Sequence, residues 1–213
     1  MNIKKIDSGI LHSCMYIIEE NKHAIVIDPC KCVDYAEGLI IDYIIITHEH
    51  YDHISGVNEW KKTTGAPLLC SKVCAENIKD PKKNMSRYFE AFCMIQTWIP
   101  TEQIEVKNVE DYTCEADKTF EGETVLEWQK HKITLFELLG HSKGSIGIYV
   151  DNADFFSGDS LMRDYDVELR LPGGSDYEWK ISGKKKIEAI PEGTMIWPGH
   201  FDNYIMHKHI KSE

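Results

Sequence analysis

No stretch of the 213-residue chain approaches the run of about 18 apolar residues that a membrane-spanning helix needs. Basic residues are also scarce, because 24 Lys and Arg stand against 35 Asp and Glu and give a net charge of −11. Proteins that bind nucleic acid rely on clustered Lys and Arg to contact phosphates, and the single basic triplet here is Lys184-Lys185-Lys186. We therefore expect neither a membrane protein nor a nucleic-acid-binding protein.

The chain also lacks the cysteine patterns of disulfide-rich and zinc-finger proteins. It has seven cysteines, an odd number, and no two of them are spaced as CxxC. Free thiols in a reducing compartment explain such a set better than a disulfide framework. The first residues, Met1–Asp7, mix charged with apolar side chains and do not form the apolar segment of a secretory signal peptide. We therefore expect a cytoplasmic protein.

Histidine and acidic residues are concentrated at positions 47–53, which read Thr-His-Glu-His-Tyr-Asp-His. The apolar run Ile44–Ile46 directly before them is typical of a buried strand, so these polar side chains follow the end of a core strand. Neutral imidazoles and ionised aspartates are ligands that suit Zn²⁺ and similar divalent metals. An accidentally histidine-rich loop would explain a single HxH pair, but the full HxHxDH pattern favours a metal site.

Three later turns each present one histidine or aspartate after an apolar strand. They centre on His141, Asp159 and His200, and a glycine precedes each of these residues. Glycine permits the positive φ or the close backbone approach that such turns often need. One such turn alone would be more typical of a structural hydrogen bond. Together with the motif at 47–53, the three turns predict a single metal-binding cluster.

This ordered set of residues closely resembles the metallo-β-lactamase superfamily, in the HxHxDH branch that includes the glyoxalase II-type hydrolases. The resemblance covers nearly the whole chain, from about Ile3 to His200. It implies an α/β (α+β) fold, a four-layer αββα sandwich in which helices flank two mixed β-sheets. It also implies two metal ions, with the following ligands. The first ion would be held by His48, His50 and His141, the second by Asp52, His53 and His200, and Asp159 would bridge both.

A pair of metals of this kind indicates hydrolytic chemistry. Two divalent ions, Zn²⁺ in the first place with Fe or Mn as alternatives, would share a hydroxide as nucleophile and polarise the scissile bond. Asp52 would have a second, catalytic role, because its free oxygen could orient the hydroxide and accept its proton. We expect a small thioester or ester as substrate, with lactones and phosphodiesters as alternatives. A mononuclear iron enzyme resembling persulfide dioxygenases and a non-enzymatic metal sensor are the competing hypotheses.

This chain departs from the glyoxalase II pattern in features that bear on substrate binding. Thirteen residues follow His200, so we expect no C-terminal helical domain of the kind that helps glyoxalase II bind glutathione. Four side chains are candidates for contacts with a small-molecule substrate. They are Arg163, Tyr165, Arg170 and Phe201. Phe201 stands where the family usually has glycine. Pairing with surface acids is an equally good explanation for the two arginines.

The remaining pattern predicts a single domain over residues 1–213, with a helical insertion near 80–115. Within this insertion, Ser86–Thr97 has aromatic residues at helical spacing, which is typical of an amphipathic helix packed on the sandwich. A lid over the cleft and a contact in a homodimer are the functional alternatives. Elsewhere we expect one helix over Asp52–Lys62, and a hairpin of two strands, Thr119–Trp128 and Lys132–Leu139.

Overall fold

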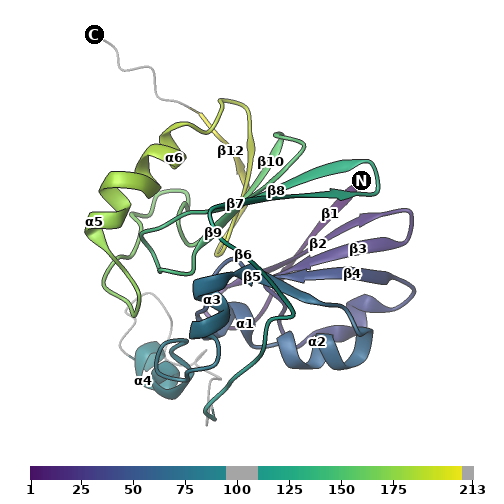
Figure 1. The fold of residues 1–213 in the computed structure, drawn as a ribbon, viewed down its shortest axis with the longest axis horizontal. Coiled ribbons are helices and arrows are strands. Elements are labelled where there is room, and N and C mark those ends of the chain that lie inside the picture. Colours follow the sequence, from purple (N-terminus) through teal and green to yellow (C-terminus); the bar gives the residue numbers. More distant parts are fainter. Residues whose placement is uncertain (95–109, 208–213) are drawn as a thin grey trace.

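The computed structural model describes residues 1–94 and 110–207, and its strands form two six-stranded sheets that pack face to face (Figure 1). The first sheet, in the order β1 to β6, is antiparallel from β1 to β3 and parallel from β3 to β6. Its strands are β1 (Asn2–Asp7), β2 (Cys14–Glu20), β3 (His23–Ile27), β4 (Ile40–Ile45), β5 (Leu68–Ser71) and β6 (Lys118–Phe120).

The second sheet has the order β12-β11-β10-β9-β8-β7, and it is antiparallel except for the pair β10–β11. Its strands are β7 (Glu123–Trp128), β8 (His131–Glu137), β9 (Ile146–Val150), β10 (Asp154–Gly158), β11 (Met195–Pro198) and β12 (Tyr204–Ile205). Both sheets are therefore mixed, as predicted.

Apolar side chains alternate along the strands of the first sheet and bury both of its faces. On β2, Tyr16 and Ile18 belong to the cluster between the sheets, where they lie with Leu135 of the second sheet. The intervening Met15 and Ile17 belong to a different cluster, on the outer face. Because successive side chains of a strand point to opposite faces, a continuous apolar strand of this kind must be covered on both sides.

Helices provide this cover on the outer face of each sheet and complete the predicted four-layer αββα sandwich (Figure 1). On the first sheet lie α1 (Tyr51–Ile54), α2 (Val57–Thr64) and α3 (Lys72–Asn77). On the second sheet lie α5 (Asp176–Glu178) and α6 (Lys184–Glu188), joined by a π-helical turn at Trp179–Gly183. Trp60 of α2 is fully buried in the first of these interfaces, and Ile187 of α6 packs with Phe155 in the second.

The prediction of one strand over Thr119–Trp128 is wrong, because the structure divides this segment between the two sheets. β6 pairs with β5, and only β7 forms the hairpin with β8. Between β6 and β7, Gly122 has a φ of +69°, a left-handed conformation that glycine adopts readily. Its carbonyl accepts a hydrogen bond from the N–H of Glu137 at 2.9 Å. The chain crosses from one sheet to the other at this glycine.

The prediction of one helix over Asp52–Lys62 is also wrong, because α1 ends at Ile54 and α2 begins at Val57. At the break, the N–H of Gly56 donates to the carbonyl of Pro29 at 2.8 Å. A Cβ at Gly56 would overlap the carbonyl of Cys30. The loop after β3 therefore packs directly on the break, and it fixes α1, which carries two of the predicted metal ligands.

The structure describes only part of the predicted insertion at 80–115. A 3-10 turn at Ser86–Tyr88 leads into α4 (Phe89–Met94), so the first part of the predicted helix Ser86–Thr97 is helical. The rest of that helix lies outside the described residues. A further 3-10 turn lies at Val33–Ala36. Within residues 1–94 and 110–207, no helix is long and apolar enough to cross a membrane.

Candidate metal centre

Loops at the ends of four strands bring the seven predicted metal ligands together. The 47–53 motif follows β4, and the other three loops follow β8, β10 and β11. All seven residues are buried, with exposed fractions of 9% or less. They are His48, His50, Asp52, His53, His141, Asp159 and His200. Because polar side chains are rarely buried without partners, a cluster of this composition needs a specific explanation.

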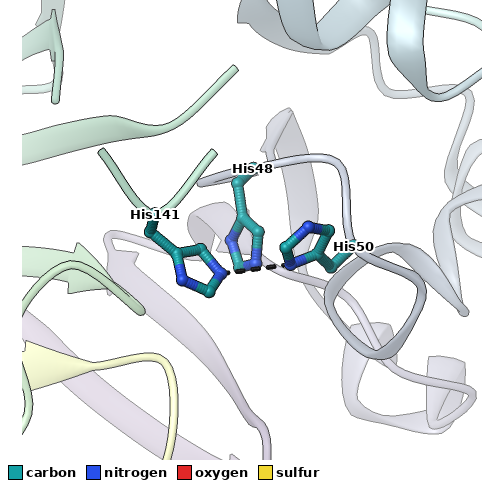
Figure 2. A group of neighbouring side chains, drawn as sticks. All are labelled: His48, His50 and His141. Atoms are coloured by element: carbon teal, nitrogen blue, oxygen red, sulfur yellow. Dashed lines mark hydrogen bonds between the residues drawn. The ribbon is translucent and has the colours of Figure 1, made fainter. Parts of the chain in front are cut away.

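Three histidines form the first group of candidate ligands. One ring nitrogen from each of His48, His50 and His141 lies within 4.8 Å of the other two. Figure 2 shows the three rings turned toward one another. Nε2 of His141 lies 3.1 Å from Nδ1 of His50. The Nε2 atom of His48 is buried and has no hydrogen-bond partner among the described residues. This unpaired nitrogen beside two others fits a bound cation.

Asp52, His53 and His200 form the second group, again with ligand atoms within 4.8 Å of one another. Nε2 of His53 lies 3.3 Å from Nε2 of His200, and Oδ2 of Asp52 lies 3.4 Å from both nitrogens. When two imidazole nitrogens face each other, a hydrogen bond between them requires that one of them carry a proton, so only the other can accept. A cation between them would satisfy both.

Asp159 lies between the two groups. Its Oδ2 is 3.6 Å from Nε2 of His141 in the first group and 3.2 Å from Nε2 of His200 in the second. Its Oδ1 is 3.3 Å from Nε2 of His53. One carboxylate therefore contacts both sets of nitrogens. The seven residues are consistent with a dinuclear metal site.

Hydrogen bonds to backbone carbonyls fix the tautomers of three of the five histidines. Nδ1 of His141 donates to the carbonyl of Glu168 at 2.9 Å, and Nδ1 of His200 donates to the carbonyl of Leu11 at 2.8 Å. In His50 the roles of the nitrogens are reversed, because Nε2 donates to the carbonyl of Pro172 at 3.2 Å. A carbonyl can only accept, so the second ring nitrogen of each histidine keeps its lone pair for a metal.

Asp28, which we did not identify from the sequence, orients the other two histidines. Its Oδ2 accepts from Nδ1 of His53 at 3.0 Å and from the hydroxyl of Thr47 at 2.7 Å. The Thr47 hydroxyl in turn accepts from Nδ1 of His48 at 3.0 Å. One carboxylate thus directs a lone pair of His53 and a lone pair of His48 into the cluster. The available sequence signal was an aspartate at the end of a strand, directly before Pro29.

Glu49, between the candidate ligands His48 and His50, is a second residue that sequence reasoning missed. It is fully buried and accepts hydrogen bonds from Nδ2 of Asn77 at 2.8 Å and from the hydroxyl of Ser142 at 2.7 Å. Because Ser142 follows the candidate ligand His141, Glu49 ties the two loops of the first group together. A side chain at Gly144 would overlap the Glu49 carboxylate, which explains the need for glycine there.

The electrostatics of the two groups differ. Burial lowers the pKa of His48 well below its ordinary value and that of His141 to about 4, so both rings are neutral, the form that binds metals. Burial acts in the same direction on the pKa of His53 and His200, but the carboxylates of Asp52 and Asp159 outweigh it and raise both values. Burial would raise the pKa of Asp159, yet His200 and His53 hold it well below its usual range. Asp159 is therefore ionised, as a bridging ligand must be.

A cleft of about 620 Å³ opens onto the cluster, and three of the four predicted substrate contacts line it. These are Tyr165, Arg170 and Phe201. Arg170 is already engaged, because its Nε and Nη2 donate to the carboxylate of Glu168 at 2.9 and 2.6 Å. The structure places Arg163 elsewhere, with its guanidinium over the ring of Tyr204 at 4.8 Å and outside the lining of the cleft. Its role in substrate binding stays a prediction, which no contact among the described residues tests.

A family model of the metallo-beta-lactamase superfamily matches residues 9–200. The chain belongs to this superfamily. The similarity covers the loops that carry all seven predicted ligands, and it agrees with the two mixed sheets and their flanking helices.

Two curated relatives are similar to this chain in sequence over most of its length. A probable metallo-hydrolase, YqgX of Bacillus subtilis, is 24% identical over 207 residues, covering 94% of this chain and 90% of the relative. A hydroxyacylglutathione hydrolase of Pelagibacter ubique is 25% identical over 191 residues, covering 86% of this chain and 64% of that protein.

Two solved structures share the fold of this chain. The BLEG-1 B3 metallo-beta-lactamase superposes with a TM-score of 0.78 at 25% identity, over 96% of this chain and 94% of that one. TTHA1623, solved in a di-iron-bound form, superposes with a TM-score of 0.73 at 21% identity, over 95% and 94% of the two chains. The second similarity concerns the fold alone.

Replacing Asp28 by asparagine is expected to weaken zinc binding by about 10- to 100-fold. An amide at this position would donate to Nδ1 of His53 instead of accepting from it, and the ring would then present N–H rather than a lone pair to the cluster. Asparagine tolerates the left-handed φ of +51° at this position, so the fold should persist. Competition against a zinc-chelating dye measures the change.

The control for this prediction is Asp42→Asn. Asp42 accepts from Nδ1 of His23 at 2.9 Å in a similar Asp–His pair that includes no predicted metal ligand. Its replacement should leave the zinc affinity as it is. Equal zinc affinities of the Asp28 variant and the original chain would contradict the role of Asp28.

Proposed function

We propose that this protein is a dinuclear metal-dependent hydrolase of the glyoxalase II-like type, acting on a small thioester or ester. The observation that carries this proposal is the pair of ligand groups with Asp159 between them, at the end of an open cleft. The names of the relatives, a probable metallo-hydrolase and a hydroxyacylglutathione hydrolase, support the hydrolytic reaction.

The ligand assignment follows from the two groups. His48, His50 and His141 would hold one cation, and Asp52, His53 and His200 the other. Such a pair of cations supplies an activated water molecule and a Lewis acid for the scissile carbonyl. The negative charge of Asp159 would offset the repulsion between the cations. The hydrogen bonds of the surrounding residues hold each imidazole in the tautomer that offers a lone pair.

Asp52 is the residue that we assign to proton transfer. It lines the cleft, and it is fixed by the short helix α1, which the break at Gly56 locks against the loop after β3. A carboxylate at the floor of a cleft can orient an attacking water molecule and accept its proton. The burial of the ligands around it excludes bulk water, which strengthens every charge interaction in the site.

Metal analysis combined with activity assays tests the proposal. The purified protein is stripped with a chelator, reloaded with zinc, iron or manganese, and assayed on a neutral thioester, a neutral ester and S-lactoylglutathione. We expect two ions per chain, and hydrolysis that chelation abolishes and metal restores. Oxygen uptake with glutathione persulfide is measured in parallel. A single iron per chain with oxygen uptake and no hydrolysis would show that the protein is an oxygenase.

A further inference from the structure

Two aromatic rings stack at the mouth of the cleft, beside the metal ligands. The rings of Tyr165 and Phe201 are 4.8 Å apart and inclined by 12°, and both residues line the cleft. Phe201 directly follows the predicted ligand His200. Tyr165 is 54% exposed although it is a large ring, so one face of the stack is accessible. The pair forms a flat apolar platform next to the place where the scissile bond would lie.

The backbone holds Phe201 in a conformation that phenylalanine rarely adopts. Its φ is +66°, in the left-handed region, where a side chain with a Cβ costs about 1 kcal/mol or more. The carbonyl of Phe201 accepts from Nζ of Lys5 at 2.9 Å and from Sγ of Cys14 at 3.4 Å, and these contacts fix the peptide. Glycine would satisfy this backbone without strain. Strained residues that persist beside a site point to a functional use of the side chain.

A tight turn presents the second ring of the platform. Met162 and Tyr165 form a β-bridge, and Asp164 between them has a φ of +64°. Arg163 anchors the other side of this turn through its contact with the ring of Tyr204. Through this contact Arg163 supports the turn that carries Tyr165.

The rest of the cleft wall is apolar, and its charged rim is negative. The wall includes Leu11, Met85, Phe89, Phe92 and Met162. Apart from the predicted ligands, the charged residues that line the described part of the cleft are Asp166, Glu168 and Arg170. The guanidinium of Arg170 is neutralised by Glu168, so one carboxylate is left in excess. An anionic substrate would meet repulsion at this rim.

We propose that the Tyr165–Phe201 platform is a specificity subsite for an uncharged substrate with an aromatic or other flat apolar group next to the scissile carbonyl. This inference rests on the proposed hydrolase function. It separates the enzyme from those that act on glutathione thioesters, because glutathione is anionic and the rim of the cleft carries excess negative charge. Stacking and burial of a phenyl group on the platform would together favour an aromatic substrate by about 10-fold or more over an acetyl substrate.

Binding of two hydroxamates to the zinc-loaded protein tests the subsite without any need for turnover. Acetohydroxamate and phenylacetohydroxamate share a metal-chelating head and differ in the phenyl group. By calorimetry we expect the phenyl probe to bind at least about 10-fold more tightly. A 4-carboxy derivative of it should bind about 5-fold more weakly than the phenyl probe, because of the acidic rim.

Variants of the platform identify the residues responsible. In Phe201→Gly and in Tyr165→Ala the preference for the phenyl probe over the acetyl probe should fall to about 3-fold or less. Tyr165 is exposed, so its variant should fold even if the Phe201 variant does not. Tyr177→Ala is the matched control, since Tyr177 is 72% exposed and lies outside the lining of the cleft. It should keep the full preference.

The results separate the subsite from the hydrolase proposal. Equal affinities of the original chain for both probes, or a preference that survives in both platform variants, would overturn the subsite. A clear phenyl preference in a protein that hydrolyses neither ester nor thioester would keep the subsite and remove the hydrolase function. Tighter binding of the 4-carboxy derivative would overturn the inference that the substrate is uncharged.

Discussion

Replacing Asp159 by asparagine will reduce hydrolysis by the zinc-loaded protein by about 1,000-fold, because this carboxylate contacts both ligand groups. Asparagine has the same size but no negative charge, so the repulsion between two divalent cations would no longer be offset. The loss of several kcal/mol of stabilisation corresponds to a rate change of this order. We expect the variant to retain its fold and to bind one equivalent of zinc tightly and the second weakly. Zinc titration, circular dichroism and the ester assay report these three properties.

The matched control for this variant is Asp164→Asn. Asp164 is an exposed aspartate in the same loop, and its φ of +64° is tolerated by asparagine. Its replacement should change neither zinc stoichiometry nor turnover. If the Asp159 variant binds two zinc ions and keeps its rate within about 10-fold, bridging by this residue is refuted.

The cluster of seven candidate ligands could be predicted from the sequence because each residue lies in a local strand-to-turn pattern. The apolar run Ile44–Ile46 identifies the strand, and the histidines and Asp52 follow it within a few residues. His141 and His200 each follow a glycine at the end of a similar strand. The convergence of these loops depends on the sandwich of two mixed sheets, which the family resemblance implied and the structure confirms.

The supporting residues could not be predicted in this way, because their partners are distant in the chain. Glu49 occupies a position that the HxHxDH motif does not specify, and its hydrogen-bond partners Asn77 and Ser142 lie 28 and 93 residues away. Asp28 is similar, since its partner Thr47 lies 19 residues further on.

The division of the segment Thr119–Trp128 between two sheets was missed for a related reason. Strand-forming residues stand on both sides of Gly122, where the chain crosses between the sheets. Local propensity predicts that a strand forms, but it does not decide which neighbour the strand pairs with.

Replacing Glu49 by alanine is expected to lower the free energy of unfolding of the metal-free protein by about 3–5 kcal/mol. The substitution leaves a buried cavity, and it leaves the amide of Asn77 and the hydroxyl of Ser142 without their acceptor. It also breaks the link between the loops of His48 and His141, so the zinc affinity of the first group should fall by about 10- to 100-fold. Urea denaturation before and after zinc loading separates the two effects.

Glu49→Gln distinguishes the hydrogen bonds of this residue from its charge. The glutamine oxygen can accept from Asn77, and its amide can donate to Ser142, whose hydroxyl then turns toward Ser145 at 2.8 Å. The free energy of unfolding of this variant should therefore lie within about 1 kcal/mol of that of the original chain. Any loss of zinc affinity that remains would measure the contribution of a buried negative charge close to the cations. A Glu49→Ala variant as stable as Glu49→Gln would mean that the two loops are held together by other contacts.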